Sequence, residues 1–210
     1  NQILNEQAII SEQSEKVKFK FTEMFGGIKN NVKIGSVAPF QTSRITAKDL
    51  STDEYITTDN MLQNKKGIVP YAGTLGNVDS VVKYQCNDIL VSNIRPYLKK
   101  IWLADKNGGC SADILVFHII DSQKYLPEYV YYALYQDEFF EFMMDDKKGL
   151  KMPRGDKNII PDFLIYDADI DLQQSFVSFV KSCDKLKFEA KKRLDSLKNA
   201  RESLVDKYFR

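Results

Sequence analysis

Apolar residues recur at every seventh position near both ends of this 210-residue chain. The N-terminal series is Ile3, Ile10, Val17 and Met24, joined near its end by Phe21 and Phe25. A repeat of seven keeps one apolar stripe on a single side of a helix, as in a coiled coil. Gly26 and Gly27 follow the series, and glycine is typical of a helix end. Residues 1–26 are therefore predicted to form an N-terminal coiled-coil helix.

The second series follows Asp171, which favours the N-cap position of a helix, with Gln174 three residues later. Its members are Phe176, Cys183, Ala190, Leu197 and Leu204, and the second seam position is filled mostly by Phe179, Val180, Leu186, Leu194 and Tyr208. A helix that reaches Phe209 would be about 58 Å long at roughly 1.5 Å per residue. Because a buried seam residue contributes roughly 1.5–3 kcal/mol, we expect both helices to pack on each other or on a partner.

Residues 27–168 are predicted to form one globular domain between the two helices. Short runs of β-branched and aromatic residues are separated by Gly, Asn and Asp clusters, which is typical of strands and turns. These runs are residues 55–57, 67–70, 78–82, 89–92, 100–104 and 113–120. Pro127 suits a first helical turn, and an apolar stripe follows it to about Met144. A linker over residues 145–157 precedes the C-terminal helix, residues 169–210.

Composition limits the classes of function. Thirty Lys and Arg against 29 Asp and Glu give a net charge of +1, so any affinity for DNA must come from local patches. Three cysteines without C-x-x-C spacing argue against a disulfide framework and a zinc site, and they favour a reducing cytoplasm. The sequence has no apolar run of membrane-spanning length and no signal-peptide pattern. Because the chain starts with Asn1 rather than Met, we expect it to be a piece of a longer protein.

The most distinctive motif lies in residues 87–117. Asn87 and Asp88 are turn residues, an apolar run follows, and Pro96 in a basic turn has no amide hydrogen for a sheet ladder. Two short strands joined by a basic turn are therefore predicted, and Gly109-Cys110-Ser111 opens a further strand. This order resembles the core of the target-recognition domain of type I restriction-modification specificity subunits. Residues 21–26 and 152–165 resemble a helix end and a loop with a short strand in the same family.

The chain also departs from that family. Where the family often has a proline-rich stretch and a Glu-Gln pair before the second helix, this chain has residues 166–170 and Gln173-Gln174. The resemblance implies a fold of the α/β (α+β) class, a mixed-sheet recognition domain whose two long helices form an antiparallel coiled coil. It also implies binding to one half of a bipartite site on double-stranded DNA.

The same resemblance implies several partners. They would be a methyltransferase subunit, a restriction subunit and a second specificity half or a second copy of the chain. S-adenosylmethionine, ATP and Mg²⁺, which serve DNA methylation and cleavage, would bind to the partner subunits, so the chain itself would hold no cofactor, no metal and no catalytic residue. The alternative is a coiled-coil adaptor whose β domain binds protein.

Candidate DNA-binding residues lie in loops with basic, amide or hydroxyl side chains. Lysine can neutralise a phosphate, whereas arginine can bridge guanine O6 and N7. The candidates are Arg44, Thr57, Asn60, Lys65, Lys66, Asn93, Arg95, Lys147, Lys148, Lys151 and Arg154. Ordinary solvated loops contain the same residue types, and Arg95 could also brace its own turn.

Two features could indicate catalysis instead. Pro161-Asp162 with Glu189-Ala190-Lys191 spells the PD…ExK pattern of many metal-dependent nucleases. Because Ala190 is a seam position, the helix interpretation is favoured and a nuclease is the third hypothesis. His118 is the only histidine and lies in an apolar run, so it is predicted to be a packed strand residue rather than a general base.

Overall fold

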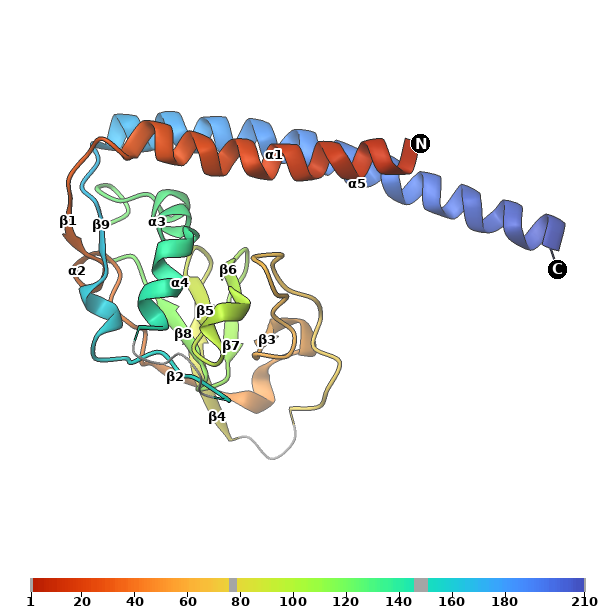
Figure 1. The fold of residues 1–210 in the computed structure, drawn as a ribbon. Coiled ribbons are helices and arrows are strands. Elements are labelled where there is room, and N and C mark those ends of the chain that lie inside the picture. The colour runs from red at the N-terminus through yellow and green to blue at the C-terminus, as the bar shows by residue number, and fades with distance from the viewer. Residues whose placement is uncertain (1, 76–78, 146–150, 210) are drawn as a thin grey trace. The chain divides into compact units, whose positions relative to one another are not determined.

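The computed structural model describes residues 2–75, 79–145 and 151–209 (Figure 1). The chain divides into two compact units. One unit combines Asn1–Gly27 with Asp171–Arg210, and the other is Ile28–Ile170. The long helices thus form one unit, and the segment between them forms the other.

The helical unit consists of α1 (Gln2–Phe25) and α5 (Ile170–Phe209). Near the end of α1, the ring of Phe21 meets that of Phe176 with 5.3 Å between centroids. Near the start of α1, Glu6 Oε1 accepts a hydrogen bond from Arg193 Nε at 3.0 Å. Because later residues of α1 meet earlier residues of α5, the pair is antiparallel (Figure 1). The two predicted helices and their antiparallel packing are confirmed.

Most of the predicted seam of α5 is confirmed. Phe176, Cys183 and Ala190 are buried. The prediction that Leu186 belongs to the seam was wrong, because this residue is 47% exposed. Lys187 occupies the inward position instead. The buried stripe runs from Cys183 to residue 187, four positions on, and then to Ala190, three positions on. An apolar residue at 186 therefore lies one position off the stripe. Leu204 is exposed as well.

The ends of the seam show two further differences. Helix α5 begins at Ile170, so Asp171 is not the N-cap but lies in the first turn, where its charge still favours the helix dipole. In α1 the buried residues are Gln13, Val17, Phe21 and Phe25. The polar Gln13 fills a seam position that a search for apolar periodicity could not find.

The second unit contains three sheets within its described residues. Strands β1 (Asn30–Lys33) and β9 (Leu164–Tyr166) form an antiparallel pair. A four-stranded sheet has the order β2 (Arg44–Thr46), β4 (Ser80–Tyr84), β7 (Gly108–Cys110), β3 (Tyr55–Ile56). A three-stranded antiparallel sheet has the order β6 (Ile101–Leu103), β5 (Ile89–Ser92), β8 (Ile114–Phe117). Strands β3 and β7 are parallel, so the predicted mixed sheet is confirmed.

The sequence located some strands and missed others. The runs at 55–57, 89–92, 100–104 and 113–120 contain β3, β5, β6 and β8, and the run at 78–82 overlaps β4. The strand predicted at 67–70 was wrong, because these residues make only an isolated bridge between Ile68 and Met61. Strands β1 and β2 were not predicted. Gly109 and Cys110 were predicted to open the following strand, but they belong to the separate strand β7, and β8 begins at Ile114. In β7 a Cβ on Gly108 would collide with the Glu54 carbonyl oxygen and the Tyr84 hydroxyl. Only glycine fits this position, although its strand propensity is low.

The predicted helix over residues 127–144 is broken into two. Helix α3 (Pro127–Leu134) and helix α4 (Asp137–Met143) are separated by Gln136, whose backbone is extended. The break allows Asp137 to begin a new helix. The remaining helical segments are short: α2 (Ile34–Val37) and the 3-10 turns η1 (Ala47–Asp49), η2 (Thr52–Glu54), η3 (Pro96–Leu98) and η4 (Ile160–Asp162).

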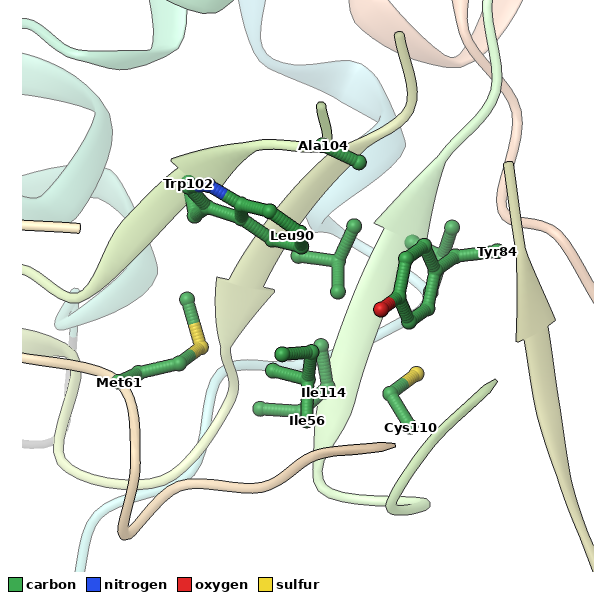
Figure 2. Packing of buried hydrophobic residues seen from close by; sticks show 9 residues of the cluster. Ile56, Met61, Tyr84, Leu90, Trp102, Ala104, Cys110 and Ile114 are labelled. Carbon is green, nitrogen blue, oxygen red and sulfur yellow. The ribbon is translucent and has the colours of Figure 1, made fainter. Parts of the chain in front are cut away.

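One hydrophobic core cluster of this unit joins the three-stranded and four-stranded sheets (Figure 2). The Tyr84 ring meets Trp102 edge-on at 5.8 Å, and its hydroxyl donates to the Glu54 carbonyl oxygen at 2.9 Å. Burial raises the pKa of the Cys110 thiol to about 12, so this cysteine behaves as a packed apolar residue. Leu90 and Trp102 anchor the β5–β6 hairpin in this core, which fixes the position of its turn.

Candidate nucleic-acid interface

The turn of the β5–β6 hairpin carries the Arg-Pro motif. The strands pair antiparallel, with Ile89 opposite Leu103, as the motif predicted. Arg95 has a left-handed backbone with φ of 50°, and Lys99 has φ of 49°. The 3-10 turn η3 lies between them, where Leu98 N–H donates to the Arg95 carbonyl at 2.9 Å. Two basic residues therefore mark the two ends of one tight turn.

A second basic turn is hydrogen-bonded to the first. Asn64 N–H donates to the Leu98 carbonyl at 2.9 Å, and Lys65 N–H donates to the Lys99 carbonyl at 2.8 Å. Asn64 and Lys65 are also left-handed, with φ of 57° and 61°. Main-chain hydrogen bonds thus fix the position of residues 63–66 against the Arg-Pro turn.

A third segment pairs with the other part of the same turn. Arg95 N–H donates to the Pro153 carbonyl at 2.8 Å, and Gly155 N–H donates to the Asn93 carbonyl at 3.1 Å. We call residues 63–66, 93–100 and 151–157 the basic strip. Its cationic residues are Lys65, Lys66, Arg95, Lys99, Lys100, Lys151, Arg154 and Lys157. Three loops that are far apart in the sequence therefore form one surface.

Asp137 balances two of these cations. Its Oδ1 lies 2.6 Å from Lys65 Nζ and 2.8 Å from Lys99 Nζ. The Lys65 side chain is only 8% exposed, and its ammonium lies over the Tyr135 ring, 4.6 Å from the centroid. Lys65 therefore braces the strip from within, and we leave it out of the proposed DNA contacts. Lys66 on the same turn is exposed.

Lys100 and Arg95 lie close enough to influence each other. Lys100 Nζ donates to the Thr58 carbonyl oxygen at 2.5 Å. Burial lowers the pKa of Lys100, the Asp59 carboxylate opposes this effect, and the Arg95 guanidinium lowers the pKa further. The middle of the strip thus holds two cations that repel each other.

The 151–157 segment presents its cations to solvent. Arg154 Nη2 lies 3.2 Å from Asp113 Oδ1, and the Arg154 side chain is 61% exposed. Such an exposed pair contributes about 0–1 kcal/mol, so Arg154 can exchange this partner for a base edge at little cost. Lys151 is exposed. Lys157 Nζ donates to the Ala112 carbonyl oxygen at 3.4 Å.

Thr57 and Asn60 are buried and lie outside this surface. Asn60 Oδ1 accepts the Thr57 N–H at 2.7 Å, and Asn60 Nδ2 donates to the carbonyl oxygens of Tyr55 and Val69 at 3.0 and 3.1 Å. Their polar groups are used to hold the loop that carries Thr58. We therefore leave both residues out of the proposed interface.

The remaining candidates are spread elsewhere. Arg44 is exposed on β2, where Nε donates to Ser80 Oγ at 2.9 Å and Nη2 donates to the Ser80 carbonyl at 2.6 Å. It therefore belongs to the edge of the four-stranded sheet rather than to the strip. Lys147 and Lys148 lie outside the described residues.

Asn93 is a buried part of the strip. It is 5% exposed, and its Oδ1 has no hydrogen-bond partner among the described residues. A Cβ on residue 155 would lie 2.6 Å from this oxygen, which explains why glycine occupies that position.

Lys99, Lys100 and Lys157 were not among the predicted site residues. The lysine pair directly after the Arg-Pro turn was the signal that could have indicated the first two.

The features that could indicate catalysis lie on separate elements. Asp162 pairs with Lys33 Nζ at 2.6 Å, whereas Glu189 and Lys191 are exposed on either side of the buried Ala190. Within residues 2–75, 79–145 and 151–209, no three His, Cys, Asp or Glu side chains gather as metal ligands.

The prediction for His118 was wrong, because β8 ends at Phe117 and the histidine side chain is 39% exposed. Its Nδ1 lies 2.7 Å from Oδ1 of the buried Asp88.

No helix in the described part of the chain is long and apolar enough to cross a membrane.

Comparison with known proteins finds likeness in fold alone. No protein-family model and no curated protein matches the sequence. A type I restriction-modification S subunit from M. genitalium matches with a TM-score of 0.61 and 14% identity, over 97% of this chain and 56% of its own. The HsdS subunit from Thermoanaerobacter tengcongensis matches with a TM-score of 0.57 and 12% identity, over 96% and 52%. The chain has the fold of a type I S subunit.

A third structure, a chain of a type I restriction-modification system, matches with a TM-score of 0.56 and 12% identity, over 98% of this chain and 53% of its own. The fold resemblance predicted from the Arg-Pro motif and the flanking helices is therefore confirmed. The chain spans about half the length of these S-subunit structures.

Proposed function

We propose that the chain is a DNA-specificity subunit, or one half of one, of a type I restriction-modification system in the cytoplasm. It binds one half of a bipartite site on double-stranded DNA through the basic strip. The observation that carries this proposal is the joining of three basic loops into one surface on a domain with the S-subunit fold. With a net charge of +1 on the whole chain, such a local surface is what DNA affinity requires.

Within the strip, the proposed roles follow the chemistry of each side chain. Exposed lysines such as Lys66 and Lys151 neutralise phosphates and set the overall affinity. Arg154 presents a planar fork that matches O6 and N7 of guanine in the major groove. Phosphate contacts position the domain, and base contacts specify the sequence.

The coiled coil is the proposed docking element. It binds a methyltransferase subunit and a restriction subunit, and it pairs with a second specificity half or a second copy of the chain. S-adenosylmethionine, ATP and Mg²⁺ bind to the partner subunits in this proposal, and the chain itself catalyses nothing. The antiparallel α1–α5 pair and the half-length match to S subunits support this arrangement.

The test is selection of preferred duplexes from a random pool by the chain together with its methyltransferase partner. We expect one defined half-site per recognition domain and an affinity that falls steeply with salt. A coiled-coil adaptor that binds protein would instead assemble with its partners and enrich no sequence. The logarithmic salt slope, measured on a selected duplex and on a scrambled one, separates phosphate contacts from base contacts.

A further inference from the structure

Two large apolar residues of the basic strip are exposed. Tyr97 in η3 is 48% exposed, and Met152 is 54% exposed. Cations of the same loop flank each of them in the sequence. A single exposed apolar residue is ordinary on a protein surface. Here two of them lie within one cationic surface, where they offer a contact that a phosphate cannot use.

Backbone pairing brings these two residues to the same part of the strip. Arg95 N–H donates to the Pro153 carbonyl at 2.8 Å, one residue beyond the antiparallel bridge of the two segments. Continued by one more residue, this register places Met152 beside Pro96, at the start of η3. Tyr97 follows directly in the same turn. The hydrogen bonds that join the loops therefore also fix where the two exposed apolar residues lie.

Burial alternates along residues 152–155. Met152 and Arg154 are exposed, whereas Pro153 and Gly155 are buried. Such alternation is typical of an extended chain, in which every second side chain points to the same side. At about 3.3 Å per residue, positions 152 and 154 are about 6.6 Å apart along the chain. Two steps of a DNA duplex cover nearly the same length, at about 3.4 Å each.

DNA offers an apolar side chain few partners. The phosphates are charged, and the base edges in the major groove are polar except for the C5-methyl group of thymine. Arginine reaches O6 and N7 of guanine in that same groove. Met152 lies on the same side of the chain as Arg154. It is therefore directed toward the groove in which the thymine methyl group is found.

We propose that Met152 contacts the C5-methyl group of a thymine within about two base pairs of the guanine read by Arg154. The Tyr97 ring, on the neighbouring turn, shields this contact from water. The proposal rests on the proposed function and deepens it, because it assigns to the strip an apolar reader beside its cations. Lysines attract every sequence alike, whereas the apolar contact favours a T·A pair.

The experiment compares thymine with uracil in duplexes bound by the full chain together with its methyltransferase partner. Each thymine of the selected half-site is replaced singly by 2′-deoxyuridine, which removes the methyl group and keeps the base pair. One such replacement, near the guanine that Arg154→Ala identifies, should weaken wild-type binding about fourfold, as expected for one buried methyl group. The salt slope should stay the same, because no charge changes.

Four variants assign the preference to its side chains. Met152→Ala should bind the thymine duplex more weakly and should bind the thymine and uracil duplexes equally, because both changes remove the same contact. Met152→Leu keeps the apolar volume and should keep the preference. Tyr97→Phe keeps the ring and should keep it as well, whereas Tyr97→Ala should reduce it.

Ile120→Ala is the matched control. Ile120 is 63% exposed and belongs to the same unit, but it lies outside the basic strip. This variant should keep both the affinity for the duplex and the preference for thymine. The comparison of thymine with uracil on the wild-type chain needs no variant, so it decides the proposal even if a substitution disturbs folding.

The outcomes separate this proposal from the proposed function. If no single uracil replacement changes wild-type affinity, or if Met152→Ala keeps the preference, the apolar contact is rejected while sequence-selective binding still supports the proposed function. A chain that enriches no duplex together with its partner rejects the proposed function and this contact with it. Unchanged duplex binding by Met152→Ala, with weaker assembly with the methyltransferase subunit, would overturn the proposal and assign the exposed residues to a protein interface.

Discussion

The backbone N–H of Lys65 donates to the carbonyl of Lys99 at 2.8 Å, and the ammonium groups of the same two residues share Asp137 Oδ1. Main chain and side chain thus join the two basic turns at one place. Asp137 can reach both because α4 begins there, after the break at Gln136. The surface proposed to bind DNA therefore depends on where a neighbouring helix starts.

Asp137→Asn should destabilise the domain unit by about 2 kcal/mol, because it removes the charge that pairs with the largely buried Lys65. Urea denaturation measures the change. Asp162→Asn is the matched control, since its pair with Lys33 is exposed on both sides and should contribute only about 0–1 kcal/mol. Equal effects of the two variants would mean that Asp137 does not brace the strip.

Arg95→Gly should retain or increase stability while weakening duplex binding. Glycine relieves the left-handed strain but gains entropy in the unfolded chain, so the free energy of unfolding should rise by at most about 1 kcal/mol. Asn87→Gly is the control: it changes the left-handed residue outside the two turns and should leave duplex binding unchanged. Thermal unfolding and duplex titration are measured on both variants. A large loss of stability in Arg95→Gly would assign Arg95 a mainly structural role.

Arg154→Ala should reduce duplex affinity by about 1–3 kcal/mol and relax the preference at one base pair. Lys151→Ala should weaken all sequences alike and lower the salt slope by about 1. Binding titrations on the selected half-site and its single-base variants, at several salt concentrations, distinguish the two. If neither the affinity nor the salt slope changes in either variant, the 151–157 segment is not part of the interface.

Duplex affinity should fall with rising pH before ordinary lysines lose their protons, near a pKa of about 10.4. Burial lowers the pKa of Lys100, so the folded chain loses this proton at a lower pH than the unfolded chain. Folding stability therefore gains from Lys100 as pH rises through that window, whereas the basic strip loses one of its cations. Lys100→Arg keeps a charge throughout and should abolish the early fall. Affinity titrations at increasing alkaline pH provide the measurement.

The length of α5 should set the spacing between two half-sites. One heptad inserted after Leu197 keeps the seam in phase and adds about 10 Å, which corresponds to roughly three base pairs at 3.4 Å each. The half-site sequences should stay the same. Methylated sites recovered from a random-spacer library give the result, and an unchanged spacer in an assembled complex would favour helices that serve only to dock partners.

Local patterns predicted the parts of the fold that local forces determine. The helices follow from repeats of seven, and the β5–β6 hairpin follows from an apolar run and a proline turn. Strand β7 could not be predicted, because glycine has a low strand propensity. Gly108 is in the sheet because its neighbours leave no space for a Cβ, and the sequence alone does not show that. The break at Gln136 was equally hidden, since the apolar stripe continues through it.

The site shows the same division. Arg95, Arg154 and Lys66 were predicted separately from their loops, but their common surface depends on hydrogen bonds between distant segments. Thr57 and Asn60 had the composition of a surface loop, yet each satisfies the other inside the fold. Residue type indicates which groups can bind DNA, and only the tertiary structure tells which of them remain available.

The backbone pairing at Asn93 and Gly155, like that at Lys65 and Lys99, also affects how such a domain can evolve. Because amide and carbonyl groups join the loops, exposed side chains such as Lys66 and Arg154 can be exchanged without loosening the attachment between segments. Under the proposed function, a new target preference then requires substitutions at a few outward positions rather than a new loop geometry. The hydrogen-bonded backbone of the three loops can then stay constant while the side chains proposed to contact DNA change.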